Sequence, residues 1–331
     1  MSKVRHVTVS EADDGQRLDR WLKKQLEGTP FGLIQKLVRK GQVRVDGKRA
    51  KGDMRLAYGQ DVRIPPVESK EQKEKRKLTA EDKAYIQSLV LFDDGDIVAI
   101  NKPYGLPTQG GSGIYRHVDF YADGLKNDKG IAPRLVHRLD KDTSGVLLLA
   151  RSAKAVRELG RMFKGRSLRK YYWAICVPAP EMPDGEIHAA IGQSPKKEMM
   201  MVDPEEGRPA STYFEVIEHA GKKAAFVMFW PRTGRKHQIR VHAHKMGNPI
   251  LGDTKYEIEN DHPEQDIHIM QELGLADRLH LHAQRIMFKH PLTNEMMDIQ
   301  ASLPDELKKS WKALGFNTGY KEDPFTDIAL S

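Results

Sequence analysis

A strand-length apolar run that follows directly on a dense polar segment is the feature that most constrains the fold of this chain. The run 146–150, Val-Leu-Leu-Leu-Ala, is apolar at every position, which is typical of a buried strand. The polar segment 137–145 ahead of it predicts a loop that ends at the start of that strand. Because reactive side chains are often held at rigid strand ends, Asp140 is a candidate catalytic carboxylate.

Asp140 has two interpretations on these residues. Arg138 lies two positions before it and the Thr143 hydroxyl three positions after, and such neighbours would keep the carboxylate ionised. The same segment also fits an Asx-turn, in which Asp140 or Asp142 only caps its own backbone before the strand. On these residues alone, the turn is the favoured interpretation.

The composition is that of a soluble globular protein. The 331 residues are enough for about two domains, and 30% of them are charged. No apolar run approaches the ~20 residues of a membrane-spanning helix, and the first residues lack the apolar core of a secretory signal. The single cysteine, Cys176, excludes an internal disulfide and a cysteine-based zinc site. We therefore expect a cytoplasmic protein without a membrane partner.

The positive charge is concentrated near the N-terminus. Between Gly15 and Ile64 there are 13 basic and five acidic side chains, which account for the whole formal net charge of +8. Solvated helix faces could explain single charges, but the one-sided count predicts a module that binds a polyanion. The candidate phosphate-binding residues are Arg17, Lys36, Arg39, Lys40 and Arg44.

Apolar spacing predicts the elements of this basic module. Two helices are expected over residues 18–26 and 33–38, because apolar side chains recur there at helical intervals. Asp46-Gly47 predicts the turn of a tight hairpin, and residues 61–64 predict a closing strand. The module is thus a compact α+β unit.

The composition also predicts the domain boundaries. The basic module is expected over residues 15–66, followed by a charged linker over 67–83 with almost no apolar side chains. A larger domain is expected over 84–309, and the tail 310–331 is expected to be poorly ordered.

The larger domain is predicted to be built on a sheet. Strand-like runs recur at 96–100, 171–177, 212–217 and 224–230, with short turns rather than long helices between them. This pattern favours an α+β fold with a mixed, mainly antiparallel sheet flanked by helices over a Rossmann or barrel repeat.

A second polar stretch predicts a short helix over residues 236–246. Arg240 and His237 lie on one side of this helix. His242 and His244 suggest a metal site, but no adjacent carboxylate or cysteine spacing completes one. We therefore expect phosphate contacts here and no metal.

Further strand and loop segments carry candidate binding residues. Strand alternation places Tyr172 on one face and its neighbours Tyr171 and Trp173 on the other, where aromatic residues are either core or stacking partners for a base. Leu281 fits an apolar pocket wall and the core equally well. The glycine-rich segment 110–113 could let backbone approach a phosphate, but surface loops have the same composition.

Taken together, these stretches resemble the RluA/RluC family of ribosomal RNA pseudouridine synthases, and most closely its RluC branch. The basic module resembles the S-four-type (αL) RNA-binding domain. The resemblance extends from about Gly15 to about Ala301 and implies the pseudouridine synthase fold. The matching motifs are Asn-Lys-Pro at 101–103, Gly-Gly-Ser-Gly at 110–113, His-Arg-Leu-Asp with Thr-Ser-Gly at 137–145, Lys-x-Tyr-x-Ala at 170–174, Gly-Arg-x-His-Gln-Ile-Arg at 234–240 and Leu-His-Ala at 281–283.

The resemblance implies an activity and roles for single residues. The activity is site-specific isomerisation of uridine to pseudouridine in 23S ribosomal RNA, free or in an assembling large subunit, by a monomer without cofactor or metal. Asp140 takes the place of the catalytic aspartate, Tyr172 of the active-site tyrosine and Arg240 of the arginine that pairs with the aspartate. Arg138 takes the place of the arginine that enters the RNA stack when the target base leaves. Further RNA contacts are expected from His137, Arg235, His237 and Leu281.

Two questions stay open at this point. Asp140 could attack the ribose C1′ as a nucleophile or act as a base at C2′. The segment 257–277 departs from the family in being longer and more acidic, which concerns a surface near the site.

The alternatives to this enzyme are a binding protein and other base-directed enzymes. A catalytically inert rRNA-binding or ribosome-assembly protein would have little reason to keep Asp140, Tyr172 and Arg240 together. A zinc deaminase needs a cysteine pair that this chain lacks. A two-carboxylate glycosidase using Asp140 and Asp142 is disfavoured, because residues so close along the chain seldom straddle one bond.

Overall fold

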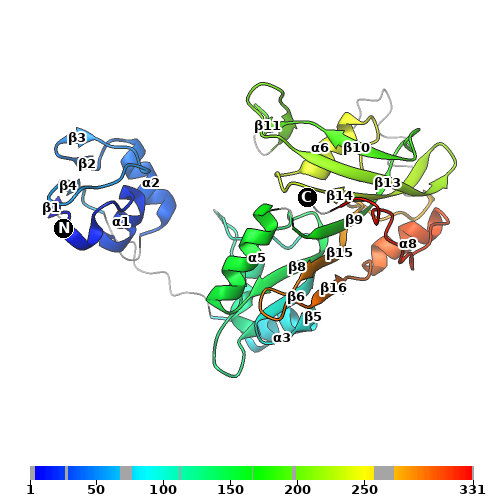
Figure 1. The fold of residues 1–331 in the computed structure, drawn as a ribbon, viewed down its shortest axis with the longest axis horizontal. Coiled ribbons are helices and arrows are strands. Elements are labelled where there is room, and N and C mark those ends of the chain that lie inside the picture. The colour runs from blue at the N-terminus through cyan, green and yellow to red at the C-terminus, as the bar shows by residue number, and fades with distance from the viewer. Residues whose placement is uncertain are drawn as a thin grey trace. The chain divides into compact units, whose positions relative to one another are not determined.

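The structure is a computed structural model that describes residues 4–26, 29–67, 77–111, 113–165, 167–195, 199–256 and 272–329. The chain divides into two compact units, Met1–Lys77 and Leu78–Ser331, and each has its own apolar core (Figure 1). Within these described ranges, every helix is too short or too polar to cross a bilayer.

The first unit packs two amphipathic helices against a small sheet of strand order β1-β4-β2-β3. Trp21, Ile34 and Val62 are fully buried between the helices and the sheet. Asp46 and Gly47 have φ values of 49° and 73°, the left-handed pair that the two-residue turn between β2 and β3 requires. The elements are β1 (Arg5–Thr8), a 3-10 helix (Glu11–Asp13), α1 (Leu18–Gln25), α2 (Phe31–Arg39), β2 (Arg44–Val45), β3 (Lys48–Arg49) and β4 (Asp61–Ile64).

The predicted helix pair, hairpin and closing strand of this unit are confirmed. Strand β1 lies ahead of the predicted start at residue 15 and extends the sheet of this unit, because it pairs antiparallel with β4. The predicted linker, 67–83, is too long at its C-terminal end. Thr79 forms a capping box with Asp82 at the start of α3 (Ala80–Ser88), so the second unit begins at Leu78 rather than at 84. Residues 68–76 of that linker lie outside the described ranges.

The second unit is built on one large sheet with the strand order β10-β13-β14-β9-β15-β8-β6-β5. All of its strand pairs are antiparallel except β15 with β8, which confirms the predicted mixed, mainly antiparallel sheet. Strand β16 pairs with β15, and β7 pairs with β8. The strands are β5 (Val90–Asp93), β6 (Ile97–Lys102), β7 (Arg134–Leu135), β8 (Ser144–Ala150), β9 (Arg169–Cys176), β10 (Asp184–His188), β13 (Ser211–Ala220), β14 (Ala224–Pro231), β15 (Leu281–Lys289) and β16 (Met296–Gln300).

Helices and a small hairpin surround this sheet, as Figure 1 shows. They are α4 (Val118–Tyr121), a 3-10 helix (Ala122–Leu125), α5 (Ala153–Gly165), α6 (Gln238–Lys245) and α8 (Asp305–Ala313), with β11 (Ile191–Gln193) paired to β12 (Met200–Val202). Alternation along β9 separates two cores. Trp173 packs with Trp311 of α8 on one face, whereas Ala174 packs with Ile239 of α6 on the other. The predicted helix over 236–246 is confirmed to within two residues at each end.

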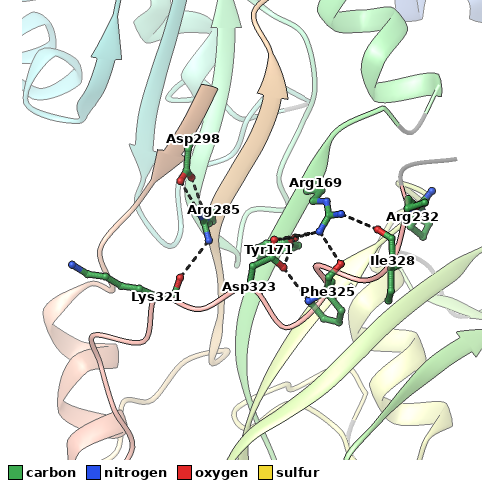
Figure 2. A network of polar contacts seen from close by, with 10 residues as sticks. Arg169, Tyr171, Arg232, Arg285, Asp298, Lys321, Asp323, Phe325 and Ile328 are labelled. Carbon is green, nitrogen blue, oxygen red and sulfur yellow. Dashed lines mark hydrogen bonds and ion pairs between the residues drawn. The ribbon is translucent and has the colours of Figure 1, made fainter. Parts of the chain in front are cut away.

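The prediction that the tail 310–331 is poorly ordered is wrong for residues 310–329, which the structure describes. Helix α8 continues to Ala313, and the chain beyond it buries Phe316 and Phe325 against the sheet. Asp323 accepts hydrogen bonds from the Tyr171 hydroxyl at 2.7 Å and from Arg169 at 3.2 Å, as Figure 2 shows. The segment carries no motif of the family, but its aromatic residues supply the apolar surface that holds it in place.

The Asp323 carboxylate should contribute measurably to the stability of the second unit. In Asp323→Asn, Arg169 keeps its backbone acceptors but loses its charged partner, so we expect the free energy of unfolding to fall by about 1–3 kcal/mol. Chemical denaturation followed by tryptophan fluorescence measures this, because Trp230 and Trp311 lie in the same core. Asp327→Asn, an exposed position on the same segment, is the control; an equal loss in both variants would contradict the assignment.

Candidate active site

A cleft of about 720 Å³ in the second unit brings together residues from five separate segments of the chain. They come from the loop before β8, from α5, from β9, from the segment 231–240 that leads into α6, and from the start of β15. Every site residue predicted for this unit lines the cleft, namely His137, Arg138, Asp140, Tyr172, Arg235, His237, Arg240 and Leu281.

The loop that carries Asp140 is held by backbone contacts on both sides. The Thr108 hydroxyl donates to the carbonyl of Leu139 at 2.6 Å and accepts from its N–H at 3.2 Å. The Asp140 carbonyl, not its carboxylate, accepts the N–H of Thr143 at 3.1 Å. None of the residues that the structure describes forms a hydrogen bond to the Asp140 carboxylate. The alternative interpretation, an Asx-turn capped by the Asp140 side chain, therefore does not apply to this loop.

A buried lysine binds the backbone of Lys141, the residue that follows Asp140 in this loop. Lys102, at the end of β6, is fully buried and donates from Nζ to the carbonyls of Pro103, Leu106 and Lys141 at 3.0, 2.9 and 3.3 Å. Burial lowers the pKa of Lys102 to about 7, although the negative charge of Asp140 opposes this shift. The contact joins the Asn-Lys-Pro motif to the loop of Asp140.

The Thr-Ser-Gly and Leu-His-Ala motifs meet where β8 runs parallel to β15. Ser144 pairs with His282, and Gly145 with Ala283. The Ser144 hydroxyl lies 2.9 Å from Nδ1 of His282. A Cβ on Gly145, whose φ is +115°, would lie 2.1 Å from the Ala283 carbonyl oxygen, so only glycine permits this approach.

Tyr172 and Leu281 form part of the apolar wall of the cleft. Tyr172 lies on the opposite face of β9 from Tyr171 and Trp173, as alternation predicted, and packs in the same core as Leu281. Burial, reinforced by the negative charge of Asp140, raises the pKa of the Tyr172 hydroxyl above its ordinary value. The hydroxyl is therefore neutral at physiological pH.

His137 has a structural role that its sequence position did not reveal. Its Nε2 accepts the backbone N–H of Leu148 at 2.8 Å, and its ring stacks on Phe163 of α5 with centroids 4.2 Å apart. Burial lowers the pKa of His137 to about 3, so the ring is neutral and cannot act as a phosphate-binding cation. Its predicted contact with RNA is therefore limited to the uncharged ring edge.

Arg240 has a different hydrogen-bonding partner from the one predicted. Its Nε and Nη2 donate to the two carboxylate oxygens of Asp253 at 2.7 and 2.5 Å, and both side chains are almost completely buried. Burial alone would lower the pKa of Arg240, but the hydrogen bonds and charge of Asp253, with a contribution from Asp140, raise it. The third nitrogen, Nη1, is buried without a hydrogen-bond partner among the described residues and lies 3.9 Å from Asp142.

Sequence reasoning missed Asp253 and Tyr256. They belong to one turn that follows Gly252, and the Asp253 Oδ1 also accepts the N–H of Tyr256 at 3.2 Å. The Arg240 guanidinium lies over the Tyr256 ring at 5.1 Å. No periodicity links this turn to α6, since 13 residues separate Arg240 from Asp253. The acidic segment that follows, 257–277, lies outside the described residues up to position 271.

Most of the remaining predicted cations are exposed, and Arg235 is half-buried. Arg138 lies at the rim of the cleft, and Arg235 donates to the Pro209 carbonyl at 3.3 Å. In the first unit, Lys36, Arg39, Lys40 and Arg44 are exposed, whereas Arg17 is paired with Asp19 at 2.7 Å. His242 contacts Thr212 and the Ala189 carbonyl. In the described parts, no group of three His, Cys, Asp or Glu side chains is arranged to hold a metal.

Comparison with known proteins identifies the family. Residues 96–245 match the family model described as RNA pseudouridylate synthase, and residues 16–62 match the S4 domain. A protein of Vibrio vulnificus (strain CMCP6) named "Ribosomal large subunit pseudouridine synthase C" is 36% identical over 95% of this chain and 97% of its own. The chain belongs to the RNA pseudouridylate synthase family. It is a pseudouridine synthase, an isomerase, and it carries an S4 RNA-binding domain, as the resemblance predicted.

Other relatives support the same assignment. The protein of that name from Escherichia coli (strain K12) is 36% identical over 94% of this chain and 97% of its own. Among solved structures, "Human RNA Pseudouridylate Synthase Domain Containing 4" superimposes with a TM-score of 0.58 at 29% identity, covering 71% of this chain and 97% of that one. The pseudouridine synthase is therefore similar to the Escherichia coli protein in sequence and to the human protein in fold.

The Arg240–Asp253 pair should be required for both stability and activity. In Asp253→Asn the buried guanidinium loses its anionic partner, so we expect the free energy of unfolding to fall by about 3–5 kcal/mol. We also expect the single-turnover rate to fall, because Arg240 is no longer held against the cleft. Thermal unfolding measures the change in stability. Release of tritium from RNA that carries the label at C5 of its uridines measures the change in rate.

Asp203→Asn, a carboxylate of a surface turn whose Oδ1 accepts the N–H groups of Glu205 and Glu206, provides the comparison. Parental stability in Asp253→Asn would contradict the importance of the pair.

Proposed function

We propose that this pseudouridine synthase isomerises uridines of 23S ribosomal RNA, with Asp140 as the reacting carboxylate. The names of relatives that match nearly the whole chain support this substrate, because these relatives are ribosomal large subunit pseudouridine synthases. The observation that carries the role of Asp140 is its position in one cleft with Tyr172, Arg240 and Arg138. A catalytically inert rRNA-binding protein would not need this set of side chains.

The chemistry is an internal rearrangement. The bond from ribose C1′ to uracil N1 breaks with its electron pair left on the uracil, the uracil turns in place, and C1′ bonds to C5. C5 then loses its proton and N1 gains one, so the product is an isomer of the substrate. No external group enters and no redox step occurs. The Asp140 oxygen acts at the ribose, either as a nucleophile at C1′ or as a base at C2′. Both routes need a carboxylate that faces the cleft and is not held by another group. Asp140 lines the cleft, and its carboxylate accepts no hydrogen bond from the described residues.

The other cleft residues act on the displaced nucleotide. Everting the target uridine costs a few kcal/mol of stacking and pairing, and exposed Arg138 at the rim can fill the space that the base leaves. Tyr172 stacks on the uracil. Since the pKa of Tyr172 is raised, its hydroxyl does not start as a phenolate, and removal of the C5 proton by this group needs a water or a carboxylate to accept it.

The S4 domain supplies affinity for the RNA backbone. Its exposed basic side chains lie on α2 and on the hairpin, and phosphate contacts of this kind position an RNA without reading its sequence. We further propose that the enzyme works as a cytoplasmic monomer, which its single buried free cysteine and separately closed cores support.

Removal of the Asp140 charge tests the catalytic assignment. We expect Asp140→Asn to abolish pseudouridine formation in a 23S transcript while the RNA affinity changes less than about threefold, because phosphate contacts dominate binding. Carbodiimide mapping of pseudouridine and filter binding measure the two properties. Asp128→Asn, an exposed carboxylate of the same unit, is the matched control. Activity close to the parent's in Asp140→Asn would remove Asp140 from the reaction.

Deletion of the first unit tests the RNA-binding assignment. A protein beginning at Leu78 keeps the complete core of the second unit. We expect weaker rRNA binding and a flatter dependence of the logarithm of the binding constant on the logarithm of the salt concentration. The slope should become less negative by roughly 0.7–0.9 for each phosphate that is no longer neutralised. RNA-binding titrations at salt concentrations between roughly 50 and 200 mM measure this slope. An unaltered slope would contradict the assignment.

A further inference from the structure

Tyr256 lies between strand β12 and the His237 ring. Its hydroxyl oxygen accepts the backbone N–H of Met200 at 2.8 Å and lies 2.7 Å from Nδ1 of His237. The two rings meet edge to face, with centroids 5.6 Å apart, and both side chains are buried. We propose that Tyr256 fixes the proton of His237 on Nε2, so that His237 donates a hydrogen bond from the cleft wall to a carbonyl oxygen of the target uracil.

The direction of the Tyr256–His237 hydrogen bond follows from the number of available protons. If Nδ1 of His237 donated, the Tyr256 oxygen would accept two hydrogen bonds and its own O–H would need another acceptor. The described residues offer none to it. If the Tyr256 O–H donates to Nδ1 instead, both the hydroxyl and the Met200 N–H are satisfied. The imidazole then carries its proton on Nε2.

His237 is neutral and held in an unusual backbone conformation. It stands at the start of α6 with φ at +54°, and its carbonyl accepts the N–H of Val241 at 2.9 Å. Side chains at left-handed positions of this kind are often functional. Burial lowers the pKa of His237 to about 4, although the negative charge of Asp140 opposes the shift. The ring therefore acts near neutral pH as a donor without net charge.

Three other buried histidines of this unit have no such freedom. His242, His280 and His282 each contact protein groups through both ring nitrogens, and His282, for example, lies between the Ser144 hydroxyl and the Ala301 carbonyl. His237 contacts a described residue only through Nδ1, and it lines the cleft together with Asp140 and Tyr172. Its Nε2–H is thus available to a ligand.

The reaction needs a donor of this type, and this step rests on the proposed function. When the C1′–N1 bond breaks, its electron pair stays on the uracil, and the negative charge spreads to the carbonyl oxygens. A fixed N–H aimed at one of them stabilises that charge more than it stabilises the neutral uridine. No proton is transferred to the carbonyl. Tyr256 is a positioning residue, since it acts through His237.

Single-turnover kinetics of three variants test the proposal. We expect His237→Ala to lower the rate constant about 100-fold at saturating RNA, and Tyr256→Phe to lower it about tenfold because the ring loses its anchor. The double variant should be no slower than His237→Ala, because Tyr256 acts only through His237. Tyr121→Phe, at a buried tyrosine of α4 outside the cleft lining, is the control.

The kinetic results can overturn the proposal in two ways. Effects of the two single variants that multiply would show that Tyr256 does not act through His237. A change confined to the RNA concentration at half saturation would make His237 a binding residue only. Circular dichroism and thermal unfolding show whether each variant folds. If His237→Ala does not, His237→Gln replaces it.

An NMR measurement on the RNA-free enzyme separates this proposal from the proposed function. Long-range ¹H–¹⁵N spectra, with the His237 signals identified by difference from His237→Gln, should give the Nε2-protonated tautomer in the parent. In Tyr256→Phe the pKa of His237 should rise from its depressed value. A proton on Nδ1 in the parent overturns the inference even if the enzyme modifies 23S RNA; the Nε2 tautomer in an enzyme that leaves 23S RNA unmodified contradicts only the substrate.

Discussion

The close approach of strands β8 and β15 is the constraint on which the catalytic unit depends. It is the single parallel pairing among the described strand pairs of the sheet, and it joins the antiparallel half that contains β9 to the half that contains β6. The Ala283 carbonyl fills the place where any Cβ at position 145 would lie. Because Asp140 precedes β8 and Tyr172 lies on β9, the separation of these two side chains is set by this contact.

Buried charge organises the space around that contact. Lys102, Arg240 and Arg278 are all buried, and each donates hydrogen bonds to protein groups. The Arg278 guanidinium donates to Ser144 at 2.9 Å and to Glu306 of α8 at 2.7 Å, so it links the β8–β15 junction to the C-terminal helix. Asp140 differs, since its carboxylate accepts no hydrogen bond from the described part of the chain. The Arg240 guanidinium, which Asp253 holds, and the Asp140 carboxylate thus line one preorganised cleft.

The C-terminal segment shows where local sequence patterns mislead. After Lys309 the chain has no family motif, and the ends of a chain are commonly poorly ordered, which predicts disorder for the tail. Its apolar side chains are instead spaced irregularly, at Trp311, Phe316 and Phe325, and each fills a gap on the face of β9 and β14 opposite to the cleft. Such a segment is ordered by the surface that it covers, and that surface is not readable from its own sequence.

The local sequence pattern was sufficient to predict most helices and strands, and the family motifs were sufficient to predict which residues line the cleft. The strands, the helix pair of the S4 domain, the Asp46-Gly47 turn and the face of Tyr172 follow from spacing and turn chemistry, which act over a few residues. The motifs were enough to place Asp140, Tyr172 and Arg240 in one site.

Only the tertiary structure decided which groups pair with one another. Arg240 binds Asp253 rather than Asp140, His137 is held by Leu148, and Tyr256 reaches His237. These contacts join residues that lie 11 to 19 positions apart along the chain. Buried side chains choose partners by distance and desolvation in the folded state, which no periodicity of the sequence records.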